Sequence, residues 1–345
     1  MIVGASVVGS YLASLTGMDV WERNNGQKEK PCSTLISKRG YDDLLGRGYD
    51  DLIANKVKGA VIHAGKEELA VERKENVAFV ISRLGLQRRL AEVAESRGAS
   101  ISYGRAWKGE QDEFVVGADG AASGVARSIG VKRDYFYAFQ AHASMKQDPS
   151  FVHLYFGDYS RGLFAWSIPH SENEVELGLG VNGGNAGDCF RLFCSSIGVR
   201  FDETWKRQAA LIPVFDASQP TVRGNVALVG DAAAQVKATT GGGIVFGLRC
   251  ARILADAIRK NDLGSYERGW RNLHERDLRM HGRVRRFIDA ADMPRLVGDL
   301  RNAEIGKTIS LKGDMDHPRS LLASVALKSL VAPRLWKYLP QMMFA

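Results

Sequence analysis

Glycines and a serine near the N-terminus are spaced to bind a phosphate group. Residues 1–9 predict a short apolar strand, a tight turn that carries Gly4, Ser6 and Gly9, and the start of a helix. The free N–H groups and the positive end of such a helix suit a dinucleotide pyrophosphate. Ser6 stands where this fingerprint has its second glycine, so the alternative that Gly4 and Gly9 are ordinary turn glycines stays open.

An acid follows this turn at the distance that a nucleotide ribose requires. Residues 19–22 predict a second strand that ends in Glu22, roughly 20 residues after the first glycine, where a ribose hydroxyl needs an acceptor. We assign Arg23, which is next in the chain, to the same ligand.

Two later strands and a second glycine-rich turn converge on the same place. Residues 115–120 and 225–231 predict apolar strands that end in Gly-Ala-Asp-Gly and Gly-Asp, and doubly wound sheets bind ligands at the carboxyl ends of their strands. Three consecutive glycines then precede an amphipathic helix predicted to reach residue 258. Two glycine-rich helix starts together indicate a flavin dinucleotide. The residues assigned to it here are Asp119, Gly120, Asp231, Gly241, Gly242, Gly243 and Ile244.

The order of these motifs resembles that of the FAD-dependent reductases of the geranylgeranyl reductase family, within the para-hydroxybenzoate hydroxylase class of flavoproteins. The resemblance spans nearly the whole chain. It departs from the family at Ser33-Thr34, where glycines are usual, at Phe164, which replaces a tyrosine, and at Ile168, which replaces a phenylalanine. Besides the segments above, it includes Lys30-Pro31-Cys32, Arg83 within residues 80–86, residues 162–169 and residues 313–318.

The resemblance implies FAD as the cofactor, bound in part by Arg83, and a reaction at Cys32 in the active site. It also implies an isoprenoid tunnel lined by Phe164, Trp166, Ile168 and Pro169. The first three of these alternate along one predicted strand, so they share a face. Ordinary sheet packing is the alternative for them, and a small buried hydrophobe in a loop is the alternative for Cys32.

The expected activity is the saturation of C=C double bonds in geranylgeranyl chains, on precursors of membrane lipids such as digeranylgeranylglycerophospholipids. The sequence has no second Gly-x-Gly-x-x-Gly strand-turn-helix that could bind a nicotinamide and no hydrolase motif, so electrons should pass through the flavin. NADPH, ferredoxin or a reduced deazaflavin could supply them. A flavin monooxygenase on an aromatic or polyene substrate, and a flavoprotein electron carrier to quinone, are the alternatives.

The strand and helix patterns predict an α/β fold: a Rossmann-like FAD-binding domain, an inserted antiparallel β-sheet domain for substrate, and a helical C-terminal region. The FAD-binding domain is expected to be discontinuous, because four predicted strands with Gly, Asp and Asn turns interrupt it. The expected ranges are residues 1–130 and 220–300 for the FAD domain, 131–219 for the substrate domain and 301–345 for the C-terminal region.

The composition bears on whether the protein binds nucleic acid, metal ions or membranes. The 345 residues carry 47 Lys+Arg and 39 Asp+Glu, which gives a net charge of +8, but acids interleave with the arginines of residues 268–301 and disfavour nucleic acid. The four cysteines have no metal-ligand spacing, so we expect no metal and reduced thiols in the cytoplasm. Residues 320–340 are apolar, aromatic and basic, which is consistent with a peripheral membrane contact or with packing on the core.

Overall fold

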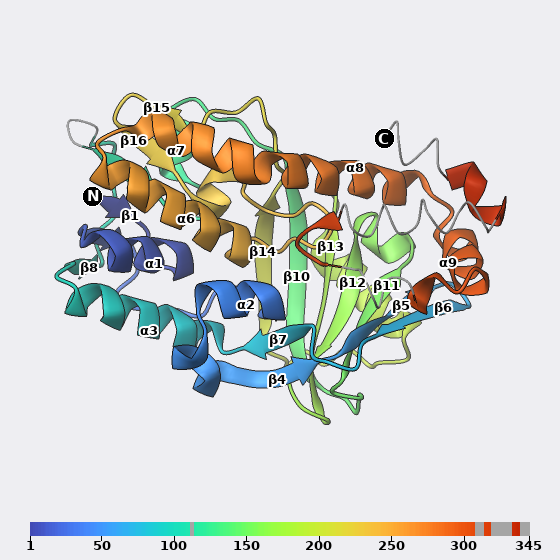
Figure 1. Cartoon of the computed structure of the whole chain (residues 1–345). Helices are drawn as coiled ribbons and strands as arrows, with labels where there is room; N and C mark the ends of the chain where they lie inside the picture. The colour runs from blue at the N-terminus through green and yellow to red at the C-terminus, as the bar shows by residue number, and fades with distance from the viewer. Residues whose placement is uncertain (111–113, 308–313, 319–332, 339–345) are drawn as a thin grey trace.

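The structure, a computed structural model, describes residues 1–110, 114–307, 314–318 and 333–338. Its described part contains a parallel sheet, a larger sheet that is mostly antiparallel, and helices that include a C-terminal group (Figure 1). The predicted fold class, an α/β protein with a Rossmann-like sheet, an antiparallel sheet and C-terminal helices, is confirmed.

The parallel sheet places the predicted ligand residues at neighbouring strand ends. In spatial order it consists of β15 (Val222–Arg223), β16 (Val226–Leu228), β9 (Val115–Gly117), β1 (Ile2–Val3), β2 (Val20–Glu22) and β8 (Ile101–Tyr103). β1 pairs in parallel with β2 and with β9, and β9 pairs in parallel with β16, while the short edge strand β15 is antiparallel to β16. The loops after β1, β9 and β16 therefore leave the same edge of the sheet.

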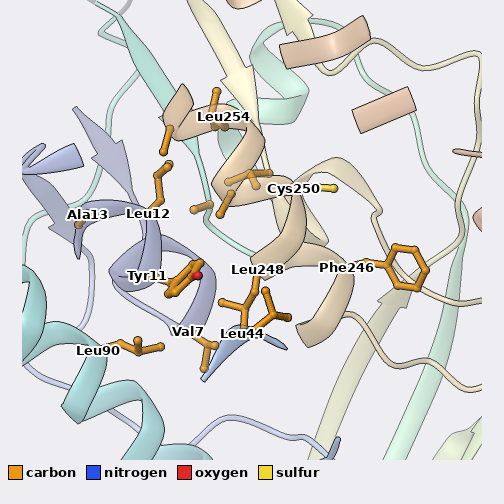
Figure 2. Close-up of a cluster of buried hydrophobic side chains, with 14 of the residues drawn as sticks. Val7, Tyr11, Leu12, Ala13, Leu44, Leu90, Phe246, Leu248, Cys250 and Leu254 are labelled. Carbon is orange, nitrogen blue, oxygen red and sulfur yellow. The ribbon is translucent and has the colours of Figure 1, made fainter. Parts of the chain in front are cut away.

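Helix α1 (Val7–Thr16) packs between α3 (Arg83–Ser96) and α6 (Ile244–Arg259). Figure 2 shows Tyr11 and Leu12 of α1 in the same core as Leu248 and Leu254 of α6. The first glycine-rich turn and the triple glycine thus begin two helices that lie against each other.

A seven-stranded sheet forms the other half of the molecule. In spatial order it consists of β14 (Arg207–Pro213), β10 (Tyr135–Ser144), β13 (Glu174–Val181), β12 (Gly162–Pro169), β11 (Phe151–Phe156), β5 (Gly59–Ala64) and β6 (Glu67–Glu72). A small sheet of β3 (Leu35–Ser37), β7 (Ala78–Ile81) and β4 (Ile53–Val57) lies beside it. The four strands predicted in residues 135–181 are present and antiparallel to one another where they pair.

The large sheet differs from the sequence-based expectation at one edge. Strands β5 and β6 fall in the range 1–130, which we expected to build the FAD domain, but β5 pairs in parallel with β11 over residues 59–64. The sheet is therefore mixed, and it recruits a hairpin from the N-terminal part of the chain. The pairing joins residues about 90 positions apart, such as His63 and Tyr155, which no local pattern encodes.

Helices cover the outer surfaces. Figure 1 shows α8 running from the parallel sheet toward the large sheet. The helices not yet given are α2 (Lys38–Leu44), α4 (Gly124–Ser128), α5 (Ala186–Ser196), α7 (Leu263–Trp270), α8 (Arg276–Ala290) and α9 (Met293–Asn302), with 3₁₀ turns at Arg47–Leu52, Asp158–Ser160, Gly230–Ala233 and Pro333–Tyr338 and a π turn at Arg271–Glu275. Among the residues described, no helix is long and apolar enough to cross a bilayer.

One aromatic residue of the expected membrane-contacting tail packs on the protein instead. Tyr338 is buried, its ring lies 6.2 Å from that of Phe287, and its hydroxyl donates to Asp299 Oδ2 at 2.8 Å. The apolar run within residues 319–332 and residues 339–345 lie outside the described part of the chain. The membrane contact therefore remains a prediction.

Candidate active site

A cavity of about 1630 Å³ extends from the carboxyl ends of the parallel strands to the inner face of the large sheet. Its wall contains most of the residues singled out from the sequence: Ser6, Arg23, Cys32, Arg83, Asp119, Gly120, Phe164, Trp166, Ile168, Asp231, Gly241, Gly242, Gly243 and Ile244. Gly4, Gly9, Glu22 and Pro169 lie outside the lining. The fold therefore brings residues from both halves of the chain to one cavity, although their roles there stay predictions.

The first turn requires glycine because backbone approaches backbone. Gly4 has φ +103°, and a Cβ on it would lie 2.6 Å from the carbonyl oxygen of Ala118. A Cβ on Gly9 would lie only 1.9 Å from the Gly4 carbonyl oxygen. These contacts hold α1 close to the strand, with its N-terminal residues Ser6, Val7 and Val8 at the cavity wall. The geometry fits a bound phosphate group.

Arg83 adds positive charge beside this turn. It donates from Nη2 to Ser6 Oγ at 3.0 Å and from Nη1 to Gln87 Oε1 at 3.2 Å, while its buried Nε has no hydrogen-bond partner in the described structure. Ser6 also donates to Gln87 at 3.1 Å. A guanidinium with a spare buried donor suits an anion. Gln87, four residues along α3, was missed because nothing local distinguishes it from a surface glutamine.

Two of the predicted acids hold the loops around the cavity. Glu22 is buried, and its carboxylate accepts from the backbone N–H of Ala5 at 3.1 Å and that of Asn24 at 3.0 Å. Asp119 accepts from Ser123 Oγ at 2.5 Å and from the N–H of Gly124 at 2.7 Å, so it caps α4. Both side chains have a structural function, and their contact with a ribose or a flavin remains a prediction.

Asp231 lies against the triple glycine. A Cβ on Gly243 would be 2.7 Å from Asp231 Oδ1, so only glycine lets the backbone come this near the carboxylate. Asp231 is accessible through the cavity, but the surrounding protein withdraws it from bulk water, and this raises its pKa. The positive charges of Arg83, Lys30 and Arg133 act in the opposite direction and limit the rise. The same loss of water lowers the pKa of Lys30, which also lines the cavity.

Beneath the glycines lies a buried ion pair that the sequence did not reveal. Lys237 Nζ is 2.7 Å from Asp316 Oδ1, and Ser37 Oγ donates to Asp316 Oδ2 at 2.5 Å. Burial acts to raise the pKa of Asp316, but Lys237 and Ser37 outweigh it and lower that pKa to about 2. Burial and the Lys237 charge lower the pKa of His281 to about 4. Lys237 and Asp316 belong to two motifs of the family resemblance, residues 230–243 and 313–318. Their presence in these motifs is the feature of the sequence that could have pointed to the pair.

The sheet side of the cavity is mostly apolar, with one polar cluster, Gln140 and Glu176, on the same face of the sheet. Phe164, Trp166 and Ile168 are buried and share the cavity-facing side of β12, as predicted from their alternation. Trp166 Nε1 donates to Glu176 Oε1, and Gln140 Nε2 donates to Glu176 Oε2, both at 3.1 Å. Burial raises the pKa of Glu176 to about 8. Pro169 accepts a hydrogen bond from Asn55 and lies outside the cavity wall.

Cys32 lies at the cavity wall, where its loop also contacts the large sheet. Its half-buried thiol accepts from the N–H of Thr34 at 3.4 Å, and Thr34 is a non-glycine residue with φ +55°. Gln140 Nε2 donates to the Cys32 carbonyl oxygen at 3.4 Å, which connects this loop to the Glu176 cluster. Burial raises the pKa of Cys32, so the group carries its proton near neutral pH.

Other cysteines and acids form no comparable centre. All four cysteines are free, and Cys194 and Cys250 are buried in cores away from the cavity. Within the described residues, no group of three or more His, Cys, Asp or Glu side chains is arranged to hold a metal ion.

Comparisons with known proteins agree with this geometry. The chain is 27% identical to the digeranylgeranylglycerophospholipid reductase of Methanothrix thermoacetophila, over 91% of this chain and 93% of the relative. It matches the crystal structure of a geranylgeranyl bacteriochlorophyll reductase-like protein from Thermoplasma acidophilum with a TM-score of 0.78 and 20% identity, over 98% of both chains. Over most of its length, this chain is therefore similar to the geranylgeranyl reductase-like FAD-dependent flavoproteins.

Other flavoenzymes share the fold of the geranylgeranyl reductase-like family. A probable FAD-dependent monooxygenase from Pseudomonas aeruginosa matches with a TM-score of 0.65 and 17% identity, over 86% of this chain and 98% of the other. A family profile described as lycopene cyclase protein matches residues 188–301. The fold is therefore that of a flavin-dependent oxidoreductase, while the reaction has to be argued from the cavity.

Proposed function

We propose that this protein is an FAD-dependent reductase that saturates C=C double bonds of geranylgeranyl chains. The main support is that one continuous cavity contains both the expected cofactor residues and the apolar face of the large sheet. The glycine-rich turns, Arg83 and Asp231 line the same space as the apolar face of Phe164, Trp166 and Ile168. A prenyl chain on that face would lie against a cofactor held by the turns. Similarity to a digeranylgeranylglycerophospholipid reductase supports the choice of an isoprenoid substrate.

The residues present fit FAD, and they divide the work of the reaction. The α1 N-terminus and Arg83 would hold the pyrophosphate, and Gly241–Gly243 would bring backbone N–H groups to the flavin ring. When bound and reduced, FAD would supply the hydride that one alkene carbon takes up. The Cys32 thiol would give its proton to the other carbon and regain one from solvent. The apolar wall would position the alkene and exclude water.

An anaerobic single-turnover experiment tests this proposal. Chemically reduced, FAD-loaded protein is mixed with a geranylgeranyl lipid, flavin reoxidation is followed by absorbance, and the saturated product is confirmed by mass. We expect lipid-dependent reoxidation in the wild type. Cys32→Ala should keep FAD and lipid affinity but slow the step by about 10²-fold, the lower range for a lost general acid. Cys189→Ala, outside the cavity wall, is the matched control and should leave the rate unchanged.

The same assay addresses a monooxygenase, which the fold shared with a probable FAD-dependent monooxygenase favours as the second candidate. Rapid oxidation with oxygen plus an aromatic substrate, and none with the lipid, would establish that alternative. Rapid anaerobic oxidation by a quinone alone would indicate an electron carrier. A carrier has no use for a long apolar cavity, so we place it third.

The electron donor and the cellular location also belong to the proposal. We infer that NADPH, ferredoxin or a reduced deazaflavin delivers two electrons per double bond, and steady-state reduction of the FAD-loaded protein with each donor separates the three. We further propose a cytoplasmic protein with peripheral access to lipid. Partition between cytosol and membrane fractions, with and without high salt, is the measurement that checks it.

A further inference from the structure

Apolar residues of six strands of the large sheet, β14, β10, β12, β11, β5 and β6, line the cavity floor. On β5 and β6 the residues that line it are Ala60, Ile62 and Val71, and Ala60 pairs directly with Val71. On β11 the lining residues are Val152, Leu154 and Phe156. Residues two apart on a strand share a face, so the hairpin β5–β6 extends the face of Phe164, Trp166 and Ile168 to the edge of the sheet.

This surface begins beside the glycine-rich loop and ends far from it. At the first end, a Cβ on Gly241 would contact Ile212 Cδ1 of β14 at 2.9 Å. From β10, the neighbour of β14, to β5 there are four strand spacings of ~4.8 Å, or about 19 Å across the sheet. The floor is therefore long enough for an extended chain with one end at the loop.

Two cations stand at the far end of the floor. Lys58 and Arg73 come one residue before β5 and one residue after β6, and the N–H of Arg73 donates to the Lys58 carbonyl at 3.0 Å. Strand alternation puts them on the same face as Ala60 and Val71, and both line the cavity. Glu75 also lines this corner.

Lys58 differs from Lys38 and Arg39, two cations of the same wall. Lys38 forms an ion pair with Asp42, and Arg39 forms one with Asp314. Lys58 is exposed and has no carboxylate within ion-pair distance among the described residues. An ammonium at the end of an apolar surface matches a ligand that carries an anion on one end of a hydrocarbon chain.

We propose that Lys58 and Arg73 form the binding site for the phosphate headgroup of the prenyl lipid, whose chain runs along the floor toward the glycine-rich loop. This inference rests on the proposed function, because it takes the prenyl lipid from there. It adds the direction in which the lipid enters: the headgroup stays at the β5–β6 edge and the hydrocarbon points inward.

The test compares two probes that differ only at the headgroup, geranylgeranyl diphosphate and the neutral alcohol geranylgeraniol. Binding of each to the full FAD-loaded chain is measured by calorimetry. We expect wild type to prefer the diphosphate. Lys58→Gln should weaken diphosphate binding by about tenfold, as for one charged hydrogen bond, and leave alcohol binding unchanged. Lys58→Arg should retain the preference. Lys56→Gln and Lys74→Gln, exposed neighbours outside the cavity wall, are the matched controls.

The outcomes separate this inference from the function on which it rests. Equal loss of both probes in Lys58→Gln, or no change in either, would overturn the headgroup site while the reductase proposal stands. If wild type binds neither probe, the proposed substrate is wrong and the headgroup site falls with it. Inorganic diphosphate that competes as strongly as the lipid would show that the cations bind a free anion, which also overturns the inference.

Discussion

The two walls of the cavity are built differently: glycine-rich turns form one, and bulky apolar side chains form the other. On the parallel-sheet side, Gly243 is in the wall and Gly4 and Gly9 support it from outside the lining, and an added Cβ at any of the three would come within 2.7 Å of a neighbouring oxygen atom. On the large-sheet side, bulky side chains such as Phe164 and Trp166 form it. The first wall fixes a ligand by close approach of N–H groups, and the second by its shape. Substitutions should therefore damage the first wall by adding atoms and the second by removing them.

The largest effect is expected from Gly9→Ala. Its Cβ would meet the Gly4 carbonyl oxygen at 1.9 Å, and neither partner is a flexible side chain, so α1 must move away from β1. We expect a loss of more than about 3 kcal/mol in the free energy of unfolding and no FAD binding. Thermal and denaturant unfolding, with flavin content, measure both. Gly26→Ala, where an added Cβ has no neighbour within 4 Å, should be neutral.

Trp166→Ala tests the opposite wall. Removal of the ring should weaken binding of the prenyl lipid by roughly 1–3 kcal/mol, the cost of a large apolar contact, while FAD content stays the same. Trp166→Phe keeps most of the ring but removes the N–H that Glu176 accepts, so it separates shape from hydrogen bonding. Equal loss of FAD and lipid in Trp166→Ala would mean that the two walls are not independent.

The pH dependence of stability should reveal Glu176. Its pKa is about 8 in the folded protein and ordinary when unfolded, so the folded state holds an extra proton between these values. The resulting stabilisation is complete below the ordinary glutamate pKa and is lost as pH rises through 8, with a limiting slope of about 1.4 kcal/mol per pH unit. Glu176→Gln should flatten the curve measured by denaturant unfolding from pH 5 to 9. An unchanged slope would contradict the buried neutral acid.

The smallest effect belongs to Gly241→Ala. Gly241 has φ +70°, and its Cβ would meet only the end of the Ile212 side chain, which can move. A strain of about 1 kcal/mol should appear mainly as weaker FAD binding, because the loop is at the surface of the cavity. Titration of the apoprotein with FAD measures it. A larger effect on unfolding than on FAD affinity would assign the glycine to the fold alone.

The sequence predicts the backbone wall better than the side-chain wall. Gly4 and Gly9 are recognisable because few residues tolerate their conformation or contacts, and strand ends identify Asp119 and Asp231 from local pattern. The partnership of Gln140 with Glu176 depends on the pairing of β10 with β13, and that of Lys237 with Asp316 spans 79 residues. The local periodicity of a sequence does not show which distant strands or residues pair with each other. For the same reason, local pattern does not show that residues 59–72, which lie in the range predicted for the FAD domain, pair with the large sheet.

The Lys237–Asp316 pair also gives the chain an order of assembly. Lys237 lies under the triple glycine with its charge buried, and removal of one partner from such a pair typically costs about 3–5 kcal/mol. During synthesis, residue 316 leaves the ribosome long after residue 237 has emerged. Until then the loop holds an uncompensated ammonium and is disfavoured in its final position. The final position of the glycine-rich loop should accordingly be reached only after residues 314–318 have been made and have docked against Lys237.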